Sequence, residues 1–196
     1  MTSTKDSQKN IISEEEKFFL LGLARNTIKE YLTSKKKLSL DKKLIPKELT
    51  TKYGCFVTIS IDGNLRGCIG NIEPTKPLYQ SVIDNAISSA FQDPRFPELD
   101  SSELDLIHIE ISILTIPEKV KYSSFQDLKN KLDPLVHGVI LDKGFHSSTF
   151  LPQVWEQLSD KDEFLKQLCF KGGMNPSSFD DSSIKVSTYK AIVIEE

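Results

Sequence analysis

The stretch FVTISIDGNLRGCIG, residues 56–70, decides the fold expected for this chain. Residues 56–61 are predicted to form a strand, Asp62-Gly63-Asn64 supplies turn residues, and residues 65–69 return as a second strand. A tight hairpin of this kind joins neighbouring antiparallel strands directly. The stretch therefore predicts an antiparallel sheet at the centre of the protein.

The length of the hairpin loop decides which side chains share a face of that sheet. A two-residue loop at Gly63-Asn64 would place apolar Ile61 opposite a charged residue. A three-residue loop, with Asn64 in the left-handed conformation, makes one face uniformly apolar. We favour this second register, which pairs Ile61 with Leu65 and Val57 with Ile69.

The favoured register gathers polar side chains on the opposite face, namely those of Thr58, Ser60, Arg66 and Cys68. A guanidinium two residues from a thiol lies on the same side of a strand and favours the thiolate over the thiol. Cys68 is therefore a candidate nucleophile. The alternative is that Cys68 is a small packed hydrophobe, as cysteines in strands commonly are. Gly67 and Gly70 would let another backbone or a ligand approach closely.

Composition limits the classes of protein to which the chain can belong. Its 196 residues suit one domain, and a net charge of -3 argues against a general nucleic-acid binder. The exception is a local lysine run, residues 35–37 with Lys42, Lys43 and Lys47, which we interpret as a solvated helix end and loop. No apolar segment reaches the length of a membrane span, and the first ten residues lack a signal core. These features predict a cytoplasmic protein with no membrane contact.

The three cysteines, Cys55, Cys68 and Cys169, form no Cys-x-x-Cys pair. An odd count without a framework spacing favours free thiols in a reducing compartment and argues against a zinc site. The chain also lacks a Walker loop, a dinucleotide fingerprint, a radical SAM cysteine triplet and a histidine metal spacing. No tightly bound cofactor or metal is predicted.

Strands and helices are intermixed along the rest of the chain. Helices are predicted over residues 13–34, 78–91, 124–131 and 160–171, and strands over residues 106–114, 138–141, 148–150 and 183–195. Hairpins, rather than a helix after every strand, connect the strands, so the fold class is α+β with mainly antiparallel sheets. Residues 1–10 are predicted to be a disordered tail, and residues 11–196 a single domain.

Three segments resemble the signature sequences of a known family. Leu65-Arg66-Gly67-Cys68-Ile69-Gly70, Asp93-Pro94-Arg95-Phe96-Pro97 and Leu151-Pro152-Gln153-Val154-Trp155 occur in the order found in the AMMECR domain family. Its bacterial and archaeal members are called AmmeMemoRadiSam system protein A. The resemblance runs from about the first helix to the end of the chain. It departs from the family pattern in the turn formed by residues 143–148, so no substrate contact is assigned to that turn.

The resemblance implies an α+β fold with a larger and a smaller lobe, each of antiparallel strands covered by helices, and a cleft between the lobes. It implies no settled activity. Members are associated with a Memo-like protein and a radical SAM protein, which suggests an enzyme or enzyme component in a modification pathway with a small-molecule or protein substrate. The alternative is a non-catalytic adaptor that presents residues 65–70 to a partner protein.

The candidate site combines the residues of the hairpin with those of nearby segments. Cys68 is the proposed nucleophile, and Glu110 and His108, on the polar face of the strand at residues 106–114, are candidate acid-base groups. Arg66 and Arg95, with Gly67 and Gly70, are candidates for binding an anionic substrate. Each arginine also has a structural alternative. Arg66 could form an ordinary ion pair, for which Glu110 is one candidate partner, and Arg95 could pair with Asp93 to hold the proline-rich loop.

Overall fold

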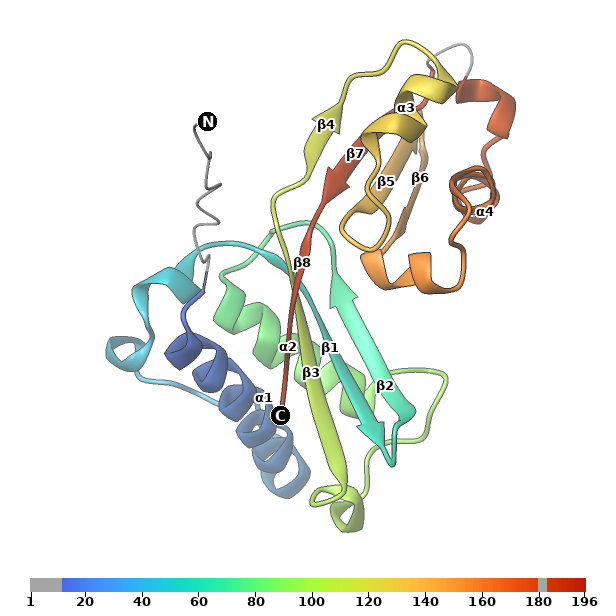
Figure 1. The fold of residues 1–196 in the computed structure, drawn as a ribbon. Helices are drawn as coiled ribbons and strands as arrows, with labels where there is room; N and C mark the ends of the chain where they lie inside the picture. The colour runs from blue at the N-terminus through green and yellow to red at the C-terminus, as the bar shows by residue number, and fades with distance from the viewer. Residues whose placement is uncertain (1–11, 180–182) are drawn as a thin grey trace, which may run out of the picture. The chain divides into compact units, whose positions relative to one another are not determined.

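The computed structural model describes residues 12–179 and 183–196. The chain divides into two compact units, the first formed by the chain up to Ser112 with Val193–Glu196, and the second by Ile113–Ile192. Each unit has its own four-stranded sheet and its own helices (Figure 1). The tail predicted over residues 1–10 lies outside the described residues.

The first unit consists of a sheet with the strand order β2-β1-β3-β8 and two helices. Its strands are β1 (Gly54–Ile61), β2 (Asn64–Asn71), β3 (Ile107–Leu114) and β8 (Ala191–Glu195). Helix α2 (Leu78–Phe91) packs against β1 and β2, and α1 (Glu14–Ser34) packs against α2 (Figure 1). Three short 3-10 helices complete this unit: η1 (Lys42–Leu44), η2 (Lys47–Thr50) and η3 (Ser101–Glu103).

The helix starts in this unit follow from local sequence. Ser13 accepts a hydrogen bond from the backbone N–H of Glu16, and the Glu16 side chain accepts one from the backbone N–H of Ser13 at 2.7 Å. This reciprocal capping satisfies two N–H groups that have no partner within the helix. Pro77 precedes α2, where its fixed φ and missing N–H suit a helix start. The predicted extents of both helices are confirmed.

The second unit has a sheet with the order β4-β7-β5-β6. Its strands are β4 (Glu118–Val120), β5 (Gly138–Lys143), β6 (His146–Phe150) and β7 (Lys185–Tyr189). Its helices are α3 (Phe125–Lys131), α4 (Lys161–Lys171) and the 3-10 helices η4 (Pro152–Glu156) and η5 (Pro176–Phe179). The β4–β7, β5–β6 and β5–β7 pairs are all antiparallel.

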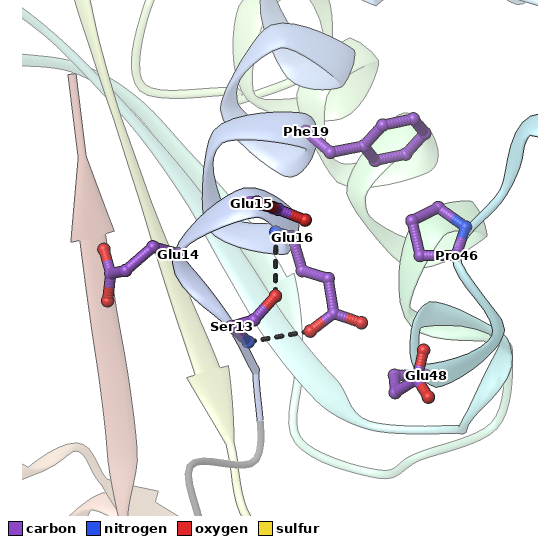
Figure 2. Close-up of a pocket in the computed structure, with 7 residues that line it drawn as sticks. All are labelled: Ser13, Glu14, Glu15, Glu16, Phe19, Pro46 and Glu48. Atoms are coloured by element: carbon purple, nitrogen blue, oxygen red, sulfur yellow. Dashed lines mark hydrogen bonds between the residues drawn. The ribbon is translucent and has the colours of Figure 1, made fainter.

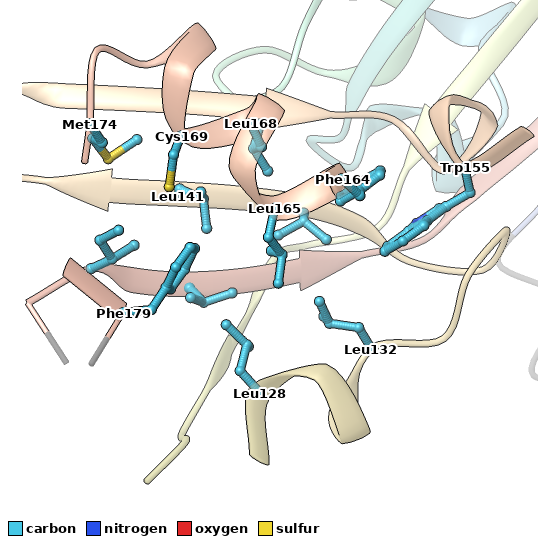
Figure 3. Packing of buried hydrophobic residues seen from close by; sticks show 13 residues of the cluster. Leu128, Leu132, Leu141, Trp155, Phe164, Leu165, Leu168, Cys169, Met174 and Phe179 are labelled. Atoms are coloured by element: carbon cyan, nitrogen blue, oxygen red, sulfur yellow. The ribbon is translucent and has the colours of Figure 1, made fainter. Parts of the chain in front are cut away.

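The hydrophobic core of the second unit includes the only tryptophan of the chain, Trp155, which lies at one end of the cluster beside Phe164 (Figure 3). Its indole is stacked on the ring of Phe164 with 3.5 Å between ring centroids, and both side chains are buried. The indole N–H donates a hydrogen bond of 2.7 Å to the carbonyl of His137. The polar atom of this large side chain therefore has its partner within the core.

The α+β class with mainly antiparallel sheets is confirmed. The sequence does not predict the short strand β4, and one predicted strand is wrong in its extent. The strand predicted over residues 183–195 is interrupted at Lys190 and forms β7 in one sheet and β8 in the other. At the interruption, Lys190 exchanges hydrogen bonds of 2.9 Å with Thr115. A continuous apolar pattern cannot show where a strand changes its sheet, because both halves are buried on one face.

Among the helices of the described residues, none is both long and apolar enough to cross a membrane.

Candidate functional site

The hairpin that carries Cys68 has a two-residue turn with an additional bulge. Asp62 and Gly63 have φ values of 51° and 74°, as a type I′ turn requires. Ile61 pairs with Asn64, so the predicted three-residue loop and the predicted pairing of Ile61 with Leu65 are wrong. An irregularity between Ile59 and Ser60 then shifts the register by one residue. Beyond the irregularity the strands have the predicted pairing, Val57 with Ile69.

Beyond the bulge, the two faces of the hairpin carry the side chains that the sequence predicts for them. Val57 and Ile59 are fully buried on the helix-covered face. Thr58 and Cys68 are direct cross-strand neighbours on the other face. The Thr58 hydroxyl donates a hydrogen bond of 3.3 Å to the sulfur of Cys68, whose side chain is partly buried. The thiol therefore lies on the polar face of the sheet, beside a hydroxyl donor.

The space beside both glycines of the motif is occupied by the protein itself. A Cβ atom built on Gly67 would lie 2.1 Å from the carbonyl oxygen of Ser89 in α2. A Cβ atom on Gly70 would lie 2.3 Å from the ring of Phe56 and 2.5 Å from the carbonyl oxygen of Cys55. The close backbone approach predicted at Gly67 is thus made by α2, and the substrate contacts of Gly67 and Gly70 stay predictions.

The proline-rich loop binds the backbone of Cys68 on the outer edge of the sheet. Strand β2 is an edge strand, so its outward N–H and C=O groups have no neighbouring strand. The Cys68 N–H donates to the Asp93 carboxylate at 2.9 Å, and the Cys68 carbonyl accepts from Nη2 of Arg95 at 3.0 Å. At Cys68, Asp93 and Arg95 thus provide the acceptor and the donor that a neighbouring strand would otherwise supply.

Asp93 and Arg95 also form a two-point ion pair with each other. Nε and Nη2 of Arg95 donate to the two carboxylate oxygens of Asp93 at 2.9 and 2.7 Å. The hydrogen bonds from Arg95, followed by those from the Cys68 and Arg95 backbones, hold the pKa of Asp93 far below its ordinary value, although burial opposes this shift. The structural alternative for Arg95 is therefore realised. Its side chain is nevertheless 53% exposed, whereas that of Asp93 is 1% exposed.

The Arg95 guanidinium combines this structural role with a direct contact to Cys68, since it donates to the carbonyl of that residue. Hydrogen bonds to Asp93 raise the pKa of Arg95 above its ordinary value, and an electrostatic interaction with the Cys68 side chain acts in the same direction. Nη1 of Arg95 is not used in the bonds to Asp93 and Cys68. A half-exposed guanidinium with donors directed away from its ion pair can bind an anion.

Arg66, in contrast, is committed to the fold. Nε and Nη2 bind the two carboxylate oxygens of Glu103 at 2.7 and 2.9 Å, and the guanidinium also donates to the carbonyls of Pro97 and Glu98. Its side chain is only 13% exposed. The partner of Arg66 is thus Glu103, and the pairing with Glu110 considered from the sequence is wrong. Arg66 ties the end of the proline-rich loop to β2.

Glu110 and His108 lie on β3, and β1 lies between β3 and the strand that carries Cys68. Two strand spacings correspond to about 9.6 Å. Glu110 accepts a hydrogen bond of 3.3 Å from Ser112, and Nε2 of His108 lies 3.7 Å from Glu195. The prediction that these two residues act on the Cys68 thiol has no contact in the structure to support it.

Apart from the surroundings of Cys68, neither the cavities nor the side-chain clusters of the described residues provide another candidate reactive site. One cavity of about 770 Å³ lies at the start of α1, where Phe19 faces Pro46 and four glutamates surround the capped helix end (Figure 2). Within residues 12–179 and 183–196, no group of three or more His, Cys, Asp or Glu side chains is placed to hold a metal ion.

The sequence comparison agrees with the three signature segments. The family model AMMECR1 matches residues 21–194, which include all three. The chain belongs to the AMMECR1 family. A protein of Methanothermobacter thermautotrophicus is 39% identical over 186 residues, covering 94% of this chain and 96% of the relative. Protein MK0488 of Methanopyrus kandleri is 40% identical over 186 residues, covering 93% and 89%.

A solved structure agrees with the fold of this AMMECR1 protein. The crystal structure of the uncharacterised protein PH0010 from Pyrococcus horikoshii matches it with a TM-score of 0.84 at 38% sequence identity. The match covers 95% of this chain and 94% of that chain. The resemblance inferred from the motifs is confirmed, and the α+β architecture is shared.

Two contributors to the site of the AMMECR1 protein were missed by sequence reasoning. Glu103 binds Arg66, and Ser89 supplies the carbonyl that requires a glycine at position 67. The spacing Asp100-x-x-Glu103 forms a capping box at η3, a recognisable signal for ordered structure but not for a partner of Arg66. No sequence signal points to Ser89, because its contact is made by the backbone.

Proposed function

We propose that this AMMECR1 protein is an enzyme, or a component of an enzyme, whose reactive group is the Cys68 thiol. Arg95 would orient an anionic group of the substrate next to that thiol. The observation that carries the proposal is the position of Cys68, whose sulfur accepts a hydrogen bond of 3.3 Å from Thr58 and whose carbonyl accepts one of 3.0 Å from the half-exposed guanidinium of Arg95.

The surroundings of the thiol support reactivity in two ways. A cationic guanidinium stabilises negative charge that develops on sulfur, and a hydroxyl donor fixes the position of the sulfur. The N–H and the C=O of Cys68 are both bonded on the outer edge of the sheet, to Asp93 and to Arg95, and β2 pairs with β1 on its other side, so the backbone that carries the sulfur is fixed. Rigid presentation lowers the entropic cost of reaching a reactive geometry.

The pathway and partners in this proposal rest on the family resemblance. AMMECR-type proteins of prokaryotes are associated with Memo-like and radical SAM proteins, so we propose that the protein acts with such partners in a modification pathway. The archaeal relatives carry no activity in their names.

Alkylation of the native protein tests the reactive-thiol proposal. We expect iodoacetamide at pH 8 to label Cys68 at least about tenfold faster than Cys55 or Cys169. Both of the latter are fully buried, and burial raises the pKa of Cys55 to about 12 and that of Cys169 to about 11. Peptide mass spectrometry after timed labelling measures the three rates. Equal protection of all three thiols would refute the proposal.

A charged reagent tests the role of Arg95. The ratio of iodoacetate to iodoacetamide labelling at Cys68 should fall about fivefold in Arg95→Gln, because the negative reagent loses its attraction to the guanidinium. Arg95→Lys is the matched control, since it keeps the charge and should keep most of the ratio. An unchanged ratio in Arg95→Gln would remove Arg95 from the site.

The structure also bears on the alternative that a non-catalytic adaptor presents residues 65–70 to a partner protein. The N–H and C=O of Cys68 are both paired within the protein and the space beside Gly67 is filled by α2, so a partner would contact side chains of this segment and not its backbone at these two residues. Cys68→Ser and Cys68→Ala distinguish the two functions in a strain that depends on the pathway. Loss of pathway output with a normally folded variant supports the enzyme, and full output supports the adaptor.

A further inference from the structure

Five residues of α1 form a stripe along one face of the helix. They are spaced symmetrically on the two sides of Gly22. Phe18 and Asn26 each lie four residues from Gly22, and Glu15 and Lys29 each lie seven residues from it. Spacings of four and seven residues return to the same face of an α-helix. Gly22 is partly exposed and the other four residues are exposed. We call this set, Glu15–Phe18–Gly22–Asn26–Lys29, the α1 stripe.

The middle of the α1 stripe contains both a protruding side chain and a hollow. The side chain of Phe18 is large and apolar, and it is 81% exposed. Beside it lies a groove of about 370 Å³, whose lining includes Gly22, Asn26, Leu38 and Leu40. A Cβ atom built on Gly22 would meet nothing within 4 Å, so the approach to the helix backbone is open.

We propose that the α1 stripe is the interface of a homodimer, in which the α1 helices of two copies cross in antiparallel orientation at Gly22. A two-fold axis through Gly22 places each residue of one copy opposite the residue at equal distance on the other side of Gly22 in the second copy. Phe18 then enters the groove beside Asn26 of the second copy. Glu15 lies opposite Lys29 of the second copy, and the same pair forms twice.

Charge and shape both favour a second copy as the occupant of this groove. The α1 stripe is acidic at its N-terminal end and basic at its C-terminal end, so antiparallel pairing matches opposite charges at both ends. Parallel pairing would instead place like charges together. Antiparallel helix dipoles also attract each other. The absence of a side chain at Gly22 lets the two helices approach closely, as small residues do at other helix crossings.

Light scattering coupled to size-exclusion chromatography, and sedimentation equilibrium over about 5–500 μM protein, test the dimer. The wild-type protein should approach twice its monomer mass of 22.2 kDa at the upper concentrations. Phe18→Glu should raise the dissociation constant at least about tenfold. Phe18→Ala should raise it by a smaller factor. Since Phe18 is exposed, both variants should retain the wild-type circular dichroism spectrum.

A charge reversal gives the specific test of the antiparallel register. Glu15→Lys and Lys29→Glu should each raise the dissociation constant about tenfold, because each places like charges together twice. The double variant restores opposite charges and should return to within about threefold of the wild-type value. A protein that remains monomeric at 500 μM, or a dimer that is indifferent to Phe18→Glu, would overturn the proposal. A double variant that is weaker than both single variants would also overturn it.

Discussion

Replacing Gly67 by alanine is expected to destabilise the first unit by about 3 kcal/mol. The added Cβ atom would lie 2.1 Å from the carbonyl oxygen of Ser89, a distance that no relaxed structure permits. Because the obstacle is backbone of α2, it cannot move aside like a flexible side chain. The helix must shift away from β2, and the packing of α2 on the sheet is lost. Urea unfolding followed by far-UV circular dichroism measures the loss.

Two further variants identify the cause of this loss. Cys68→Ala changes the neighbouring residue on the opposite face, and it should cost no more than about 1 kcal/mol. Ser89→Gly, combined with Gly67→Ala, should not restore stability, because the carbonyl oxygen of residue 89 remains. Circular dichroism is the appropriate probe, since Trp155 belongs to the other unit. A Gly67→Ala protein as stable as Cys68→Ala would show that α2 does not lie directly on β2.

The elements whose causes are local could be predicted from the sequence. The capping box at Ser13 and the proline before α2 define helix starts within four residues of sequence, and both helices were predicted correctly. The hairpin was predicted, but its register near the turn was not. Asp62 adopts positive φ together with Gly63, and the resulting tight turn forces a compensating irregularity two residues away. The alternation of apolar residues in the sequence does not reveal this irregularity. Beyond the irregularity, the strands return to the register that the alternation predicts.

The residues of the candidate site could be predicted from the sequence, but most of the contacts between them could not. Cys68 and the two arginines are identified from their neighbours in the sequence, and so is the pairing of Arg95 with Asp93, but the partners of Cys68 and Arg66 come from distant parts of the chain. Asp93 is 25 residues from Cys68, and Glu103 is 37 residues from Arg66. Which charges meet depends on how the loop after α2 folds back along β2, and this is decided by tertiary packing. The separation of Glu110 and His108 from the thiol follows from strand order, which the sequence does not state.

Asp93→Asn is expected to lower the free energy of unfolding by about 3 kcal/mol at pH 7. The buried Asp93 carboxylate accepts hydrogen bonds from the Cys68 N–H, the Arg95 N–H and the Arg95 guanidinium. An asparagine keeps one acceptor but loses the charge that binds the guanidinium. Asp84→Asn is the matched control in the same unit. Asp84 pairs with two lysines that are more than half exposed, so its replacement should cost less than about 1 kcal/mol.

The pH dependence of Asp93→Asn distinguishes a lost charge from a packing defect. The pKa of Asp93 is lowered on folding, chiefly by hydrogen bonds from Arg95, so its contribution is fully present above the unfolded pKa of about 3.9. It is lost as the pH falls from there through the lower pKa of the folded state. The stability difference between wild type and Asp93→Asn should therefore be constant from pH 7 to about pH 5 and shrink below about pH 4. Urea unfolding at intervals from pH 7 to pH 2.5 measures this difference. A difference that stays constant to the lowest pH would mean that the asparagine disturbs the loop by its shape. The ion pair with Arg95 would then not be what holds the proline-rich loop against Cys68.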